Sequence, residues 1–176
     1  MTINSRQKGA GAEREFAGMI HDWAGVRLIR NLEQTRSGGH DLIVHPDEVG
    51  SVADSFRKLA IECKRYQTAT DAQIQSWWDQ AATQADDAAL SPVLAYRADR
   101  SPWRVVVPIA LINPAHTLAT GIEYTATLSI EGFCHAMAEQ SKPGCPFCAD
   151  PSPMDLNALW PDDHFDLNAC FDKLGI

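Results

Sequence analysis

The chain has 176 residues, of which 45% are hydrophobic, and a formal net charge of −8. This composition supports one domain with a packed core and excludes a disordered chain, while the negative charge is not typical of a high-affinity, non-specific nucleic-acid binder. No apolar run reaches the roughly 18 residues that a membrane span needs. The polar first residues and the odd number of cysteines predict a cytoplasmic protein with reduced thiols and no secretory signal.

The first predicted element is a helix over residues 9–24, which ends before Gly25. Glu13 lies at the edge of its apolar stripe and should point toward the surface on which the helix packs. Glu15 lies off the stripe and is expected to be solvated. The stripe itself has the spacing of one helix face and consists of Phe16, Met19, Ile20 and Trp23.

The rest of the chain alternates strand-like and helix-like segments. Runs of apolar residues bounded by turn residues predict strands, and these cover residues 26–32, 41–45, 56–65, 91–98 and 102–110. Two further helices are predicted over residues 70–89 and 129–140, with Thr70 and Ser129 as N-caps. The order of helix, three strands, helix and further strands predicts an α/β domain with a mixed sheet. It excludes a repeat, and the chain has no glycine-rich phosphate-binding motif.

The composition shifts after residue 140 toward proline, serine and aspartate. We therefore expect a folded domain over residues 1–140 and an acidic appendage over residues 141–176, which could dock a protein partner. Cys145 and Cys148 have the C-x-x-C spacing of half a zinc site. A structural Zn²⁺ would need a second half, and unligated thiols are the alternative. The candidates for that half are Cys134, His135, His164 and Cys170.

Strand alternation brings charged residues together in the middle of the chain. Within residues 59–65, Glu62 and Lys64 share one face of the strand, opposite the apolar residues. If residues 41–45 pair with this strand, Asp41 can join them, and Glu13 can approach from the first helix. Carboxylates gathered in this way repel one another unless a cation neutralises them. The sequence therefore predicts a Mg²⁺ or Mn²⁺ site suited to phosphodiester hydrolysis, in which Lys64 serves the attacking water or the phosphate.

An Asp followed by E-x-K on the next strand resembles the PD-(D/E)xK nuclease superfamily. Within it, the chain is similar to archaeal-type Holliday-junction resolvases and related phage or bacterial endonucleases. The resemblance covers about residues 6–110, and one departure is His40, where many members have proline before the Asp. Four segments carry it: KGAGAERE (8–15), RSGGHD (36–41), IECK (61–64) and WWDQAATQA (77–85).

The resemblance implies a restriction-endonuclease-like αβββαβ core and assigns residues of this chain to roles. The implied active site consists of Glu13, Asp41, Glu62 and Lys64, with the first three as ligands of the metal. A glutamine of the following helix completes it, either Gln80 or Gln84. Lys8 and Ser37 match positions near the DNA strand. Arg36, Arg65 and Arg97 are further candidates for phosphate contacts, with solvated surface arginines as the alternative.

These residues predict a metal-dependent DNA endonuclease. The resemblance further implies that the substrate is branched DNA and that the protein is a homodimer of bacterial or phage origin. Two alternatives stay open. One is a restriction-type, replication-fork or flap nuclease on the same core, and the other is a non-catalytic DNA-binding or assembly module. For Glu62 and Lys64 themselves, the alternative is an ordinary surface ion pair on an edge strand. Trp77 and Trp78 are expected in the core rather than as platforms for stacking bases.

Overall fold

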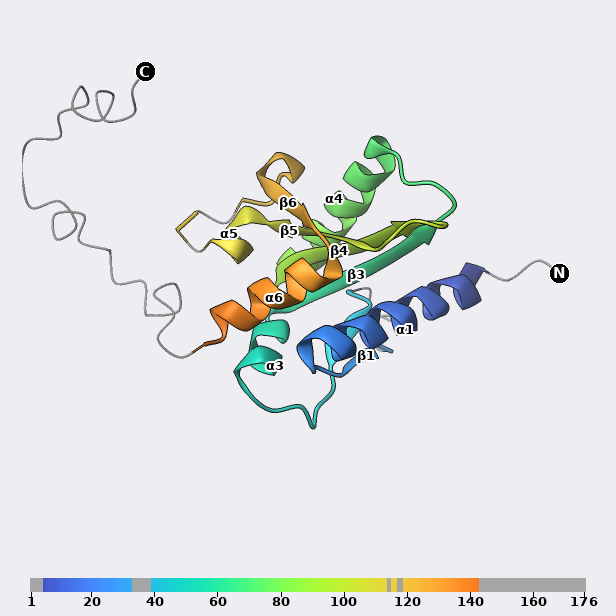
Figure 1. The fold of residues 1–176 in the computed structure, drawn as a ribbon. Helices are drawn as coiled ribbons and strands as arrows, with labels where there is room; N and C mark the ends of the chain where they lie inside the picture. The colour runs from blue at the N-terminus through green and yellow to red at the C-terminus, as the bar shows by residue number, and fades with distance from the viewer. Residues whose placement is uncertain (1–4, 33–38, 114, 117–118, 143–176) are drawn as a thin grey trace, which may run out of the picture.

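A computed structural model describes residues 5–32, 39–113, 115–116 and 119–142 of the chain, arranged as one six-stranded sheet with helices on both faces (Figure 1). The strands follow the chain order across the sheet and are β1 Leu28–Arg30, β2 Leu42–Val44, β3 Leu59–Tyr66, β4 Ser91–Ala98, β5 Arg104–Pro108 and β6 Thr125–Leu128. The helices are α1 Ser5–Ala24, α3 Ser51–Phe56, α4 Asp71–Asp87, α5 Ile109–Ile112 and α6 Ile130–Gln140, with a 3₁₀ turn η1 at Ile122–Tyr124. The predicted mixed α/β fold with an αβββαβ core is confirmed.

The pairing of β3 with β4 is parallel, while the other neighbouring strands run antiparallel. A parallel pair needs a crossover connection, and α4 provides it. Helix α4 therefore covers one face of the sheet, and α1 and α6 cover the other (Figure 1). Within the described residues, no helix is long and apolar enough to cross a membrane.

Two hydrophobic clusters hold these layers together. The larger lies between the sheet and α1, α3 and α6, and it includes Phe16 and Phe133. The smaller lies under α4 and includes Trp77 and Trp78, and the indole N–H of Trp78 donates a hydrogen bond of 2.7 Å to the carbonyl of Thr120. Both tryptophans are therefore core residues, as predicted.

Most elements match their predicted ranges, and β4 does so at both ends. The predicted strand over residues 56–65 is wrong at its start, because Ser51–Phe56 forms α3 and places Phe56 in the core. The pattern of the sequence did not predict α5, η1 or β6. The N-caps Thr70 and Ser129 are confirmed, since each side chain accepts a backbone N–H of the helix that it precedes.

The apolar stripe predicted for α1 is wrong at its C-terminal end. Trp23 is 57% exposed, although Phe16 and Ile20 are buried. The side chains that pack on the sheet follow i, i+4 spacing from Ala12 through Phe16 and Ile20 to Ala24, so Trp23 lies one position off the buried line.

Candidate active site

The site forms where the edge of β3 is left open. Strand β2 pairs with β3 only at Leu42 and Ile61, so on this side none of the described strands lies beside β3 beyond Ile61. Asp41 fills the next position. Its backbone N–H donates to the carbonyl of Ile61 at 2.9 Å, and its Oδ2 accepts the backbone N–H of Cys63 at 2.7 Å. This carboxylate thus substitutes for a strand neighbour and is fixed beside Glu62.

Glu62 lies on the face of β3 that α4 covers and is only 3% exposed. Its Oε1 accepts hydrogen bonds from Lys64 Nζ at 2.6 Å and from Gln80 Nε2 at 3.1 Å. Lys64 Nζ also donates to Gln80 Oε1 at 3.0 Å. The three side chains close a triangle, which orients the ammonium and one carboxylate oxygen together. With Asp41 they form what we term the carboxylate cluster.

Burial, together with the neighbouring charge of Asp41, raises the pKa of Glu62 to about 7, against the opposing effect of Lys64. The second oxygen, Oε2, is buried and accepts no hydrogen bond from the described residues. A buried acceptor without a donor destabilises a fold. A carboxylate with one oxygen anchored and the other unsatisfied, beside a second carboxylate, is the arrangement that a cation would stabilise.

Glu13 reaches the same place from α1. It is 8% exposed and forms an ion pair with Arg30 of β1. Together with Asp41 and Glu62 it lines a cavity of about 420 Å³, whose other lining residues are Gly9, Cys63, Lys64, Arg65, Tyr66 and Gln67. The structure therefore brings all three predicted carboxylates to one cavity, with Glu13 bound to a guanidinium.

The sequence analysis missed Arg30. Strand alternation could have found it, because Arg30 lies two residues after the buried Leu28 and so shares its face. Leu28 packs into the cluster under α1, which is the helix that carries Glu13.

The chemistry of the donors suits a divalent metal ion. Oxygen ligands with negative charge are those that Mg²⁺ and Mn²⁺ prefer, and the unsatisfied Oε2 of Glu62 beside Asp41 fits such an ion. Across the described part of the chain, however, no group of three or more His, Cys, Asp or Glu side chains is arranged to hold a metal. Asp41 and Glu62 are therefore the fitting pair, and a role for Glu13 as third ligand stays a prediction.

The other predicted site residues divide into three groups. Gln80 contacts Lys64 and Glu62, whereas the buried Oε1 of Gln84 has no hydrogen bond within the described residues. Arg65 lines the cavity and pairs with Glu15. The remaining predicted side chains lie outside the described part of the structure, and they are Lys8, Arg36, Ser37, Cys145, Cys148 and Cys170.

Of the four cysteines predicted as zinc ligands, the structure describes Cys134. It lies in the larger hydrophobic cluster of α6, and burial raises the pKa of its thiol to about 12. Zinc binds the thiolate, so this environment disfavours Cys134 as a ligand. The zinc prediction for Cys145 and Cys148 falls on residues outside the described range, as do the predicted appendage and its domain boundary.

The fold and these residues define a PD-(D/E)xK nuclease domain, in agreement with the predicted resemblance. The family described as "Phage putative PDDEXK endonuclease" matches residues 4–132, and the chain belongs to this family. Among solved structures, the Holliday junction resolvase Hjc of Archaeoglobus fulgidus is similar at 18% sequence identity and a TM-score of 0.37, over 69% of this chain and 84% of that chain. No curated protein matches the sequence.

Proposed function

We propose that this protein is a metal-dependent endonuclease that hydrolyses phosphodiester bonds of DNA. The observation that supports it best is Glu62, a buried carboxylate beside Asp41 with one oxygen held by Lys64 and Gln80 and the other unsatisfied. An ordinary surface ion pair would be exposed, whereas the side chains of Lys64 and Glu62 are 16% and 4% exposed.

Asp41 and Glu62 would hold a Mg²⁺ or Mn²⁺ ion, which polarises a phosphoryl oxygen and makes a bound water more acidic. Asp41 needs no reorganisation for this role, because the N–H of Cys63 already fixes its carboxylate. Lys64 is held by two acceptors in the wall of the cavity. Its ammonium can donate to a phosphate oxygen and stabilise the charge that develops there.

The substrate is proposed to be branched DNA, such as a four-way junction, cut by a homodimer. This rests on the motifs of the sequence, and paired symmetric cuts need two sites related by a two-fold axis. Cleavage of plain duplex or of flaps is the alternative, and a panel of substrates separates the two.

The test is cleavage of labelled four-way junction, flap and plain duplex with Mg²⁺, Mn²⁺ or EDTA. Glu62→Gln keeps the size of the side chain and removes its charge, and Glu48→Gln is the matched control, because Glu48 also pairs with a basic side chain, Arg27, but does not line the cavity. We expect cleavage by the wild type and the control, and none with EDTA or with Glu62→Gln. Equal cutting of all three substrates would reject the preference for branches. Absence of cutting by the wild type with either metal would reject the nuclease.

A further inference from the structure

A second group of charged side chains lies on the other face of β3, one residue beyond Lys64. Arg65 and Arg97 are direct neighbours in the parallel pairing of β3 and β4, and both form ion pairs with Glu15 of α1. The Glu15 carboxylate also accepts the indole N–H of Trp103 at 3.2 Å. We term Glu15, Arg65, Arg97 and Trp103 the arginine cluster. The prediction that Glu15 is solvated is wrong. The periodicity of α1 does not show that Arg97 of β4 lies beside this helix.

The arginine cluster has more hydrogen-bond donors than Glu15 can satisfy. Each guanidinium carries five N–H groups, while Glu15 offers two oxygens and shares one of them with Trp103. Arg65 has a further acceptor in Asp99 at 3.5 Å, on the exposed rim. The Nε of Arg97 is buried and donates to no group in the described structure. Such unsatisfied donors suit an anion with more acceptor oxygens than a carboxylate has.

The arginine cluster lies close to the carboxylate cluster, because Arg65 belongs to the same strand and lines the same cavity as Glu62. Arg65 lines the cavity of Glu62, and its strand neighbour Arg97 lines a second cavity of about 310 Å³ with Glu15, Trp103 and other residues. Arg65 lies three residues beyond Glu62 on β3, roughly 10 Å along the strand. At about 3.4 Å of rise per nucleotide, this distance corresponds to on the order of three nucleotides of a DNA strand.

We propose that Arg65 and Arg97 form a binding site for a backbone phosphate of DNA, a few nucleotides from the bond that is cut, and that Glu15 occupies the place of this phosphate in the free protein. This proposal rests on the proposed function. A phosphate would exchange with the Glu15 carboxylate and accept the donors that Glu15 leaves unsatisfied. The guanidinium of Arg97 stays oriented during the exchange, because it also stacks over the ring of Trp103 at 5.9 Å.

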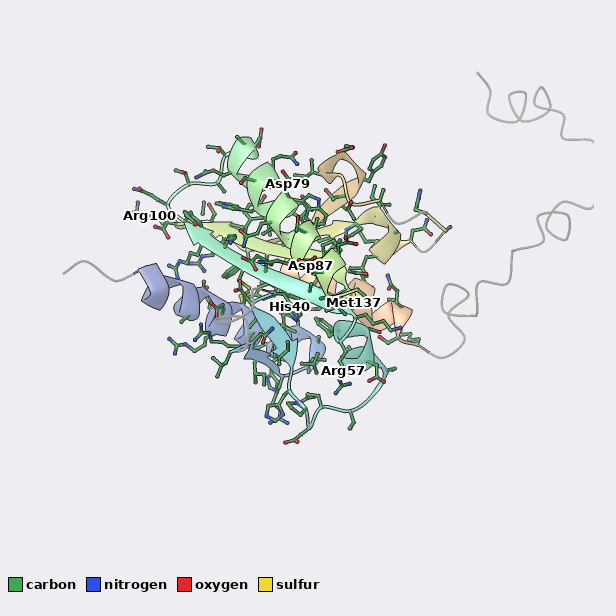
Figure 2. All side chains as sticks on the ribbon, turned by 180° about the vertical axis from the view of Figure 1, so that it is seen from behind. His40, Arg57, Asp79, Asp87, Arg100 and Met137 are labelled. Carbon is green, nitrogen blue, oxygen red and sulfur yellow. The ribbon has the colours of Figure 1, made fainter. Side chains whose placement is uncertain are left out.

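The site lies at one end of the sheet. Figure 2 shows Arg100 at the tip beyond the end of β3, and Arg57 at the opposite end of the molecule. Arg57 pairs with Asp54 of α3, so it resembles Arg65 and Arg97 in chemistry and is remote from them. This makes Arg57→Gln a matched control for the loss of an arginine from an ion pair.

The experiment measures DNA affinity as a function of salt in the Glu62→Gln background, so that binding does not depend on cleavage. Labelled duplex and four-way junction are titrated with Arg97→Gln, Arg65→Gln, Arg97→Lys and Arg57→Gln, each checked for folding by thermal melting. We expect Arg97→Gln and Arg65→Gln to bind both DNAs about tenfold more weakly. The slope of log affinity against log salt should fall by about 1. Arg97→Lys should keep the slope, and Arg57→Gln should bind like its parent.

Glu15→Gln tests the exchange directly. If Glu15 competes with phosphate, its neutral isostere should bind DNA several-fold more tightly. Folded Arg97→Gln and Arg65→Gln variants with the affinity and slope of Arg57→Gln would show that the cluster only stabilises the fold, and would overturn the proposal. So would weaker binding by Glu15→Gln. If junction binding depends on Arg97 but the wild type does not cleave DNA, this binding site is retained and the nuclease is rejected. If the wild type cleaves DNA but binding does not depend on Arg97, the nuclease is retained and this binding site is rejected.

Discussion

The carboxylate cluster and the arginine cluster lie next to each other on β3 and differ in their balance of charge. In the carboxylate cluster, the two carboxylates of Asp41 and Glu62 lie with the single ammonium of Lys64, and Oε2 of Glu62 has no donor among the described residues. In the arginine cluster, two guanidinium groups share the Glu15 carboxylate, and the Nε–H of Arg97 has no acceptor in the part of the chain that the structure describes. The carboxylate cluster thus has an excess of negative charge, which a bound metal ion would neutralise. The arginine cluster has an excess of positive charge, which a DNA phosphate would neutralise.

The difference follows from the alternation of one strand. Glu62 and Lys64 point toward α4, whereas Cys63 and Arg65 point toward α1, because successive side chains of a strand face opposite sides. Among the described strands, the short β2 covers only part of this edge of β3, and the carboxylates from both faces line one cavity there. The residues proposed for cleavage and those proposed for DNA binding therefore lie on opposite faces of β3, and substitutions on each face can test the two roles separately.

The largest effect is expected from removing the ammonium of the carboxylate cluster. Lys64→Ala should lower the rate of DNA cleavage by about 10²- to 10³-fold, because the charge that develops on the phosphate loses its donor. Its affinity for DNA should change little, in contrast to Arg97→Gln. Single-turnover cleavage and equilibrium binding measure the two separately.

Lys58→Ala is the control for this comparison, since Lys58 is exposed and lies just before the other end of β3. It should match the wild type in both measurements. A Lys64→Ala variant that cleaves at the rate of Lys58→Ala would remove Lys64 from the chemistry.

The next largest effect concerns stability and pH. The pKa of Glu62 is raised from 4.5 to about 7 in the folded protein, so the folded state binds more protons than the unfolded chain between these values. Stability must therefore fall as pH rises through this window, by about 3 kcal/mol in total without metal. Glu62→Gln should remove this loss and be more stable than the wild type at pH 8, with little difference at pH 4.5.

Thermal melting in EDTA at the two pH values measures this effect. Glu15→Gln is the contrasting variant, because Glu15 is paired with two arginines; it should not stabilise the protein at either pH. Equal stability of wild type and Glu62→Gln at pH 8 would contradict the raised pKa.

The sequence predicted the carboxylate cluster well because its information is local. The alternation of Glu62 and Lys64 within one strand and the single Asp41 on the strand before it suffice to place three side chains at one edge. The arginine cluster could not be predicted in this way. It joins Glu15, Arg65 and Arg97 from three elements, and their contact depends on the parallel register of β3 and β4, which no local pattern encodes.

Trp23 and α3 show the same limit in the fold. The apolar spacing of α1 fits two adjacent lines of side chains, and the choice between Trp23 and Ala24 is made by the surface against which the helix packs. Residues 51–56 have no strong helix signal. Phe56 is the last residue of α3, and its ring packs in the core against Phe133, a contact that the local sequence does not show.

A third prediction concerns the competition of Arg30 with a metal ion. Arg30 holds the Glu13 carboxylate at the cavity that Asp41 and Glu62 line. If Glu13 is a metal ligand, Arg30→Gln should free it and raise the affinity for Mn²⁺ several-fold, because the carboxylate no longer has to leave a guanidinium. Calorimetric titration at pH 8 measures this affinity without DNA.

Arg27→Gln is the matched control, because Arg27 pairs with Glu48 just before β1 and away from the cavity. It should bind Mn²⁺ like the wild type. Unchanged or weaker binding by Arg30→Gln would show that Glu13 serves the fold or the DNA rather than the metal.

The smallest effect on cleavage is expected at α4. Gln80 donates to Glu62 and accepts from Lys64, so it orients both groups without carrying charge. Gln80→Ala should lower cleavage about tenfold, since loss of a group that orients ligands costs on the order of 10- to 100-fold. Gln84→Ala, one turn further along α4, should cleave like the wild type. If Gln80 acts mainly by orienting Lys64, Gln80→Ala in the Lys64→Ala background should add little further loss, and an additive loss would mean that Gln80 acts through Glu62 or on the DNA itself.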